Sequence, residues 1–191
     1  GGYKGLLKNK AFIIHTLLRG TTLGVLFAYT SSSPFIVQNH YHFSATGYGI
    51  LVGVNSLFLV VGSLLSLKFK PYKRAASFGA IILCIGVALE TVALYCIHNV
   101  WLYDIFMAIE LFAVGMILST ANTLAMNEGR DRSGEASAVL GIMGYIIGGI
   151  ASPLVGLGNI LHSTAIVNIV LAILVVISAY ASSRLPADLE K

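Results

Sequence analysis

Four ionisable side chains lie within long apolar stretches of this chain, where charged groups are rare. They are Arg19, Glu90, Asp104 and Glu110. A charge at the centre of a membrane helix costs about 3 kcal/mol, so each needs a partner, water or a function. Counting along the helices puts Arg19 about 12 Å inside one boundary and Glu110 near the middle of its stretch. Burial disfavours the charged form of a carboxyl group, which makes Glu110 a candidate to bind and release a proton.

Other interpretations of these ionisable residues stay open. Arg19 and Glu110 form a structural ion pair if their helices are neighbours, and His15 lies one turn before Arg19 on the same helical face. His15 is either a second proton-sensing candidate or a hydrogen-bonded bystander. Glu90 and Asp104 lie within about 10 Å of the opposite boundary. For both, a side chain that extends to the interface is the simpler interpretation.

Uncharged polar side chains occur in the same stretches and predict a substrate cavity. They are Tyr29, Ser31, Ser32, Asn55, Asn122 and Tyr145. Facing lipid would leave their hydrogen-bonding groups unsatisfied, so they need protein or water around them. A hydrogen bond between helices also explains each of them taken singly.

The elements that must position these side chains are six apolar stretches. They cover residues 11–37, 45–67, 75–97, 101–124, 134–157 and 164–181. About twenty apolar residues cross the hydrocarbon layer of a bilayer, and helices satisfy their own backbone groups there. The chain is 57% hydrophobic and 10% charged, with a mean hydropathy of +0.85. We therefore expect an all-α integral membrane protein with little room for a soluble domain.

All twelve Lys and Arg residues lie on or near one side of the predicted membrane. Segments 38–44, 97–100 and 156–163 contain neither type, and the aromatic residues expected at that outer interface are Tyr41, Tyr48, Trp101 and Tyr103. Because cytoplasmic loops retain Lys and Arg, both termini are predicted to be cytoplasmic. Residues 1–10 form a basic segment in which Gly1 and Gly2 have the composition of a cloning scar, and 183–191 form a tail. The net charge of +4 thus indicates membrane orientation, with no nucleic-acid partner.

Small residues suggest how the six stretches are arranged. The second and fifth stretches share a Ser near the start, Ser44 and Ser133, each expected to cap its helix. Both continue with several glycines, as two copies of a three-helix unit would. An odd number of crossings makes such copies inverted, as in many transporters.

Four further residues are candidates for hinges or for close helix packing. Gly144 and Gly148 form a small-xxx-small step that lets helices approach. Pro34 and Pro153 remove backbone donors near helix ends. Both roles stay open for all four residues.

Catalytic patterns are absent from the sequence. There is no zinc-type His and Glu pairing at helical spacing, no Gly-x-Ser-x-Gly turn and no phosphate-binding glycine loop. His15 is the only central His, so a haem held by two histidines is unsupported. We expect neither an enzyme nor a bound cofactor.

Several segments, taken in order, resemble one family of transporters. Residues 28–38, Ser44 and Gly53-Val54-Asn55 resemble its seventh and eighth helices, and 134–141 with 152–157 resemble its eleventh. Residues 68–74 are similar to its basic loop between helices eight and nine. The family that they resemble is the Bcr/CflA (bicyclomycin and chloramphenicol resistance) family of drug/proton antiporters, a branch of the Major Facilitator Superfamily. Glu135 and the step 120–122 depart from its pattern.

The resemblance implies the C-terminal six helices of a twelve-helix exporter of amphipathic drugs in the bacterial inner membrane, driven by the proton gradient. The best-known proton-binding carboxylates of this family lie in the N-terminal half, so the resemblance assigns no role to Glu110. One half exposes its cavity face, so a second six-helix bundle is expected, either another copy or a separate N-terminal half. The alternative is a non-transporting assembly or regulatory module derived from a transporter half.

Overall fold

The computed structural model describes residues 2–186, and all regular structure in that range is helical. A short helix, α1 (Gly2–Lys8), precedes six long helices. These are α2 (Lys10–Pro34), α3 (Ala45–Ser66), α4 (Tyr72–Val92), α5 (Val100–Glu128), α6 (Ser133–Leu154) and α7 (Ile160–Ser183). Short segments follow three of them: η1 (Phe35–His40), η2 (Ala93–Ile97) and η3 (Arg130–Arg132). Gly1 and residues 187–191 of the predicted tail lie outside the described residues.

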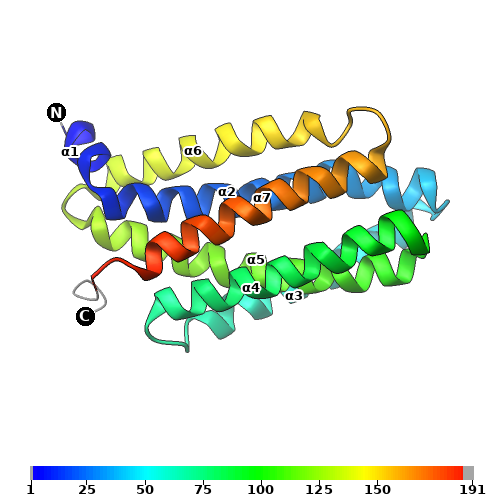
Figure 1. Cartoon of the computed structure of the whole chain (residues 1–191), viewed down its shortest axis with the longest axis horizontal. Coiled ribbons are helices and arrows are strands. Elements are labelled where there is room, and N and C mark those ends of the chain that lie inside the picture. Colours follow the sequence, from blue (N-terminus) through cyan, green and yellow to red (C-terminus); the bar gives the residue numbers. More distant parts are fainter. Residues whose placement is uncertain (1, 187–191) are drawn as a thin grey trace.

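Six helices of the described range are long and apolar enough to cross a membrane, which confirms the predicted all-α membrane architecture. They run along one long axis with alternating direction (Figure 1). The starts of α2, α4 and α6 therefore share one end of the bundle with the ends of α3, α5 and α7. We name it the basic end, because the described Lys and Arg residues other than Arg19 lie at or beyond these helix ends. The opposite end is the distal end.

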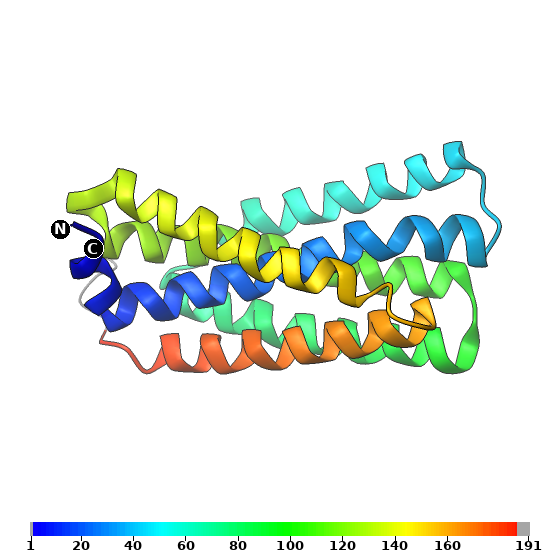
Figure 2. The same ribbon diagram turned by 90° about the horizontal axis from the view of Figure 1, so that it is seen from above.

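The two helix triplets, α2 to α4 and α5 to α7, pack on one another reciprocally. α2 lies against α5, α6 and α7, whereas α5 lies against α2, α3 and α4. The last helices of the triplets, α4 and α7, also contact each other, toward the lower side of Figure 2, while α3 lies at the upper side. The first helix of each triplet, α2 or α5, thus packs against the second and third helices of the other triplet. This arrangement is that of two inverted three-helix repeats, as predicted.

The apolar core lies between α2, α4, α5 and α7. Its fully buried members include Leu18, Leu83, Ile117 and Val175, one from each of these helices. α3 and α6 are peripheral, and the buried residues of α3 are Asn55, Gly62 and Ser66. α3 therefore leaves most of its apolar surface free for lipid or for another bundle.

Pro34 ends α2 but does not end the membrane-spanning segment. The backbone continues as the π-helix η1, and the Tyr41 N–H donates to the Ile36 carbonyl at 3.1 Å. Proline lacks the N–H that regular α-helical bonding would use, and a wider π-helical segment is one way to absorb this loss. Pro34, a hinge or packing candidate, is therefore the site of a local change of helix type.

The helix starts are set mainly by asparagines. Asn9, Asn99 and Asn159 accept hydrogen bonds from the first backbone N–H groups of α2, α5 and α7. Ser44 caps α3 as predicted, with a bond of 3.0 Å. The prediction for Ser133 is wrong, because η3 leads directly into α6 and Ser133 already has helical torsions of φ −58° and ψ −36°.

Candidate functional site

Polar side chains of α2, α3 and α5 meet in the distal half of the bundle. This distal polar cluster comprises Tyr29, Ser33, Tyr48, Asn55 and Asp104. The Asn55 amide donates to Asp104 Oδ1 at 2.8 Å, and the Ser33 and Tyr48 hydroxyls are 2.9 Å apart. The buried Tyr29 side chain lies within interaction range of Asn55, Ser33 and Asp104. The structure thus brings two predicted cavity residues, Tyr29 and Asn55, together, and it bonds Asp104 inside the protein.

Glu90 of α4, Glu110 of α5 and Asn168 of α7 meet in the core and form the buried acid cluster. All three side chains are fully buried. Asn168 Nδ2 donates to Glu90 Oε2 at 2.9 Å, and Glu110 lies within electrostatic range of Glu90. Glu110 also packs on α4 itself, since a Cβ added to Gly86 would lie 2.6 Å from Glu110 Cγ. The interpretation of Glu90 as a side chain that extends to the interface is therefore wrong.

Tyr103 of α5 is a further buried polar side chain near both clusters. Its phenol is buried and has no hydrogen-bond partner in the structure. It lies within electrostatic range of Glu90 and Glu110 and also of Tyr29 and Asp104. Tyr103 is therefore a buried polar side chain within electrostatic range of both clusters and hydrogen-bonded to neither.

Arg19 and His15 lie in the basic half of α2 and face other helices than Glu110 does. The Arg19 guanidinium donates to the Leu140 carbonyl of α6 at 3.0 Å, and His15 Nε2 lies 3.0 Å from Ser182 Oγ of α7. Neither carboxyl oxygen of Glu110 has a hydrogen-bond partner. The expected ion pair between Arg19 and Glu110 is thus not formed in the described part of the chain. Their helices are neighbours, but the two side chains point from different faces.

The remaining predicted cavity residues lie in separate environments. Ser31 bonds to Ser152 of α6, with hydroxyl oxygens 2.7 Å apart. Ser32 is buried, and its hydroxyl has no partner in the structure. Asn122 is exposed, and Tyr145 is 70% exposed. The six residues are therefore not gathered into one closed cavity of this chain, and two of them face outward.

The candidate hinge residues of α6 lie in close contact with α2. A Cβ added to Gly144 would lie 2.6 Å from the Leu23 side chain, and one added to Gly148 would meet the Phe27 ring. Both glycines are therefore packing contacts in this conformation. Pro153 lies exposed near the distal end of α6.

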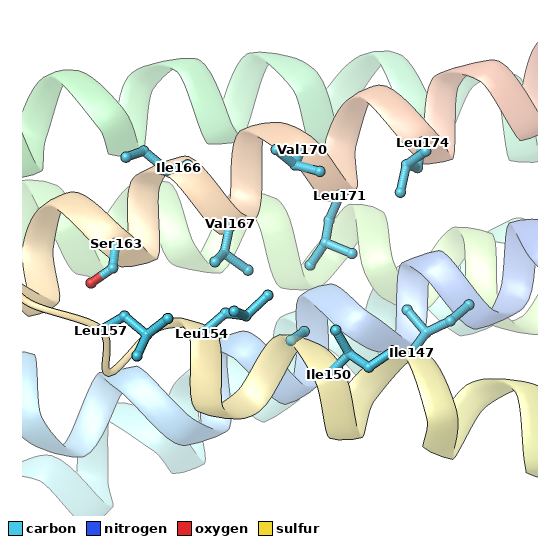
Figure 3. A pocket seen from close by; sticks show the side chains of 11 residues that line it. Ile147, Ile150, Leu154, Leu157, Ser163, Ile166, Val167, Val170, Leu171 and Leu174 are labelled. Atoms are coloured by element: carbon cyan, nitrogen blue, oxygen red, sulfur yellow. The ribbon is translucent and has the colours of Figure 1, made fainter.

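An apolar groove of 490 Å³ lies between α6 and α7, and Figure 3 shows its isoleucine, leucine and valine walls. The hydroxyl in this wall, that of Ser163, already donates to the carbonyls of Val155 and Asn159. Polar substrates need convergent hydrogen-bonding groups, which these walls do not offer. The groove suits a hydrocarbon chain, and it is lined by none of the residues of the two polar clusters.

Several residues of the two clusters, and Tyr103 near them, were not predicted as site residues. Asn168 was detectable, because a lone amide among Ile, Val and Leu in a membrane helix needs a partner. Tyr48 and Tyr103 were instead predicted to lie at the outer membrane interface, because tyrosines near helix ends favour that position. In residues 2–186 no group of three or more His, Cys, Asp and Glu is placed to hold a metal ion.

Comparison with known proteins places the chain in a family. The model of the Major Facilitator Superfamily matches residues 2–153. The chain is 34% identical over 160 residues to a protein of Bacillus subtilis (strain 168) described as the uncharacterized MFS-type transporter YdgK. That alignment covers 81% of this chain and 39% of YdgK, so the chain spans about two fifths of this curated relative's length. With most of its length matched and with two inverted repeats of membrane helices, the chain belongs to the Major Facilitator Superfamily of membrane transporters.

Proposed function

We propose that this chain is one half of a transporter that exports amphipathic molecules across a bacterial inner membrane in exchange for protons. Membership of the family, the open surfaces of α3 and α6 and the buried polar side chains of the two clusters support this proposal. In this proposal the basic end lies in the cytoplasm, because Lys and Arg are retained there. Transport proceeds by alternating access between two bundles.

The observation that carries the proposal is the open surface of α3 and α6. Both helices have glycines around which a Cβ would meet nothing within 4 Å: Gly49 and Gly53 of α3, and Gly134, Gly141 and Gly149 of α6. Glycine lowers helix stability, but it lets a second helix approach closely within a membrane. We infer that these helices receive a second six-helix bundle.

The second bundle is another copy of this chain or an N-terminal half. Two copies can pair side by side around a two-fold axis, because α1 and the end of α7 lie at the same end of the bundle (Figure 1). The exposed Tyr145 and Asn122 then line a chamber between the bundles, with the distal polar cluster behind its wall. Aromatic, amide and hydroxyl groups beside apolar side chains suit amphipathic compounds of several shapes.

A matched pair of substitutions tests which face receives the second bundle. Ile142 of α6 and Ile173 of α7 are 58% and 53% exposed. Ile142→Trp is expected to dissociate the dimer in lipid nanodiscs, whereas Ile173→Trp only faces lipid and leaves it intact. Cross-linking or single-molecule counting reads the oligomeric state. The reverse result would place the interface on α7, and a monomeric wild type would exclude pairing with a second copy.

Transport itself is tested in vesicles with an imposed pH gradient and an amphipathic fluorescent dye. Wild type is expected to move dye against protons, and Asn55→Ala is expected to reduce dye flux, because it leaves Asp104 without its amide donor. Ser183→Ala, at the exposed basic end of α7 and away from both clusters and from α3 and α6, is the control. A folded, paired protein that moves neither dye nor protons would support the non-transporting module instead.

A further inference from the structure

The buried acid cluster holds more acceptor atoms than donors. Asn168 Nδ2 serves one oxygen of Glu90, at 2.9 Å. The other oxygen of Glu90, both oxygens of Glu110 and Oδ1 of Asn168 have no hydrogen-bond partner, although each residue is fully buried. Buried acceptors without donors are rare in folded proteins, so these atoms indicate that a ligand belongs here.

No cationic side chain balances the two carboxyl groups in the described part of the chain. Tyr103 of α5 is within electrostatic range of both glutamates, and Tyr29 of α2 and Asp104 of α5 are within range of Tyr103. α7 contributes Asn168, which is not ionisable, and its His162 stacks on Tyr95 of η2 at the distal end. Arg19 is directed to α6, and His15 is bonded to Ser182. Two neighbouring negative charges without a counter-ion are strongly unfavourable in such an interior.

We propose that Glu90 and Glu110 bind a single proton between them, at a site inside the bundle that is separate from the substrate chamber. A proton on one carboxyl group supplies the missing donor and removes the like-charge repulsion in one step. Asn168 holds the Glu90 carboxyl group by Oε2, so that Oε1 stays free to share the proton. Binding is reversible and breaks no bond other than that of the proton to its carboxyl oxygen or to water.

Tyr103 gives this proton a route toward the distal end. Its hydroxyl group is both donor and acceptor, lies without a partner and is within range of both clusters. The proton lost by the pair passes by way of the Tyr103 hydroxyl to Asp104, which is half-buried and bonded to Asn55. The site therefore exchanges with the side of the membrane that the distal polar cluster faces. Its use in coupling rests on the proposed transport function, whereas proton binding does not.

Infrared spectroscopy of the whole chain in lipid tests the site directly. A protonated carboxylic acid has a C=O stretching band that a carboxylate lacks, and carbon-13 at the side-chain carboxyl of glutamate shifts only glutamate bands. Wild type is expected to keep such a band at neutral pH, with the isotope shift. The band is expected to disappear in Glu110→Gln and in Glu90→Gln, and to persist in Glu128→Gln, a matched change on α5 at the basic end. A band that is absent from wild type, or that survives in the Glu90→Gln, Glu110→Gln double variant, would overturn the proposal.

Two further measurements separate the possible outcomes. If a variant fails to fold, the isotope-labelled wild type alone decides whether a glutamate retains its proton. Titration with sodium and with choline identifies a different occupant, because loss of the band with sodium alone would assign a metal cation to the site. Tyr103→Phe is expected to keep the band and to slow its loss after a rise in pH at least several-fold. A retained band without dye transport would contradict the proposed function but still support the proton site. Proton-driven dye transport in the double variant would exclude a role of the site in coupling.

Discussion

The contact of α3 with α5 and the contact of α2 with α6 occupy equivalent places in the two repeats but are built differently. A Cβ added to Gly62 or Gly115 would collide with a backbone carbonyl of the facing helix. In α2 and α6 a Cβ added to the corresponding glycines would first meet side chains; one added to Gly24, for example, would lie 3.0 Å from the Ile147 side chain. The first contact is backbone against backbone, and the second is backbone against flexible side chains.

This contrast indicates which of the two peripheral helices can move. Backbone carbonyls cannot rotate away, so α3 and α5 fit together in one register. Leu, Ile and Phe side chains can change rotamer at modest cost, so α6 has more freedom to shift on α2. If the repeats exchange positions during transport, we expect α6 to slide and α3 to stay fixed to α5.

The largest effect is expected from Gly62→Ala and Gly115→Ala. Each added methyl group meets the carbonyl of Phe112 or Leu59, which no rotamer change can clear. We expect the free energy of unfolding to fall by at least about 2 kcal/mol, with the helices forced apart. Thermal unfolding in detergent measures the loss. Gly53→Ala is the control, because its Cβ would meet nothing within 4 Å. Equal unfolding temperatures for Gly62→Ala and Gly53→Ala would contradict the backbone contact.

A smaller effect is expected from Gly144→Ala, at the contact of α6 with α2. Its methyl group would lie 2.6 Å from the Leu23 side chain, which can turn aside. We expect a loss of about 1 kcal/mol, which is recovered in part when Leu23→Ala is added. No such rescue is available at Gly62, because truncating Phe112 leaves its carbonyl in place. Equal losses without rescue at both sites would remove the distinction between the two contacts.

The sequence was sufficient to predict the number and order of the six membrane-spanning helices, but not the short helix α1. Six apolar stretches with basic residues at alternate ends allow one simple topology. It did not predict neighbours, because membrane helices are apolar on several faces and hydropathy does not say which face meets protein. Arg19 and Glu110 illustrate this point: their depths are compatible with an ion pair, but rotation about the helix axes sends Arg19 to α6 and Glu110 to α4.

The polar clusters were predictable in part. Glu110, Asn55 and Tyr29 stood out because polar groups at mid-depth are costly. Glu90 was misjudged because its distance from the boundary was measured along the chain, whereas its surroundings are set by Gly86, which admits Glu110 beside α4. A single glycine one turn away decided the environment of the carboxyl group.

One serine–serine hydrogen bond crosses each of the two contacts. Ser31 bonds to Ser152 across α2 and α6, and Ser66 bonds to Ser119 across α3 and α5, both at 2.7 Å. Ser31→Ala is expected to cost about 0.6 kcal/mol, typical of such bonds in membranes. Ser66→Ala is expected to cost less, because Ser119 also donates to a carbonyl of its own helix at 2.9 Å. Double-mutant cycles measure both couplings, and a larger coupling at Ser66 would contradict this order.

The smallest effect on folding is expected at the open glycines of α3 and α6, which test the two surfaces directly. Gly53→Ala of α3 and Gly149→Ala of α6 add a methyl group to empty space within this chain, so stability should change by less than about 0.5 kcal/mol. If both surfaces receive the second bundle, both variants weaken pairing in lipid while thermal unfolding of the separate chain stays unchanged. If α6 slides during transport and α3 does not, Gly149→Ala also slows dye flux more than Gly53→Ala does at equal pairing. Equal dye flux in the two variants would contradict the sliding of α6 and would mean that the two contacts differ only in stability.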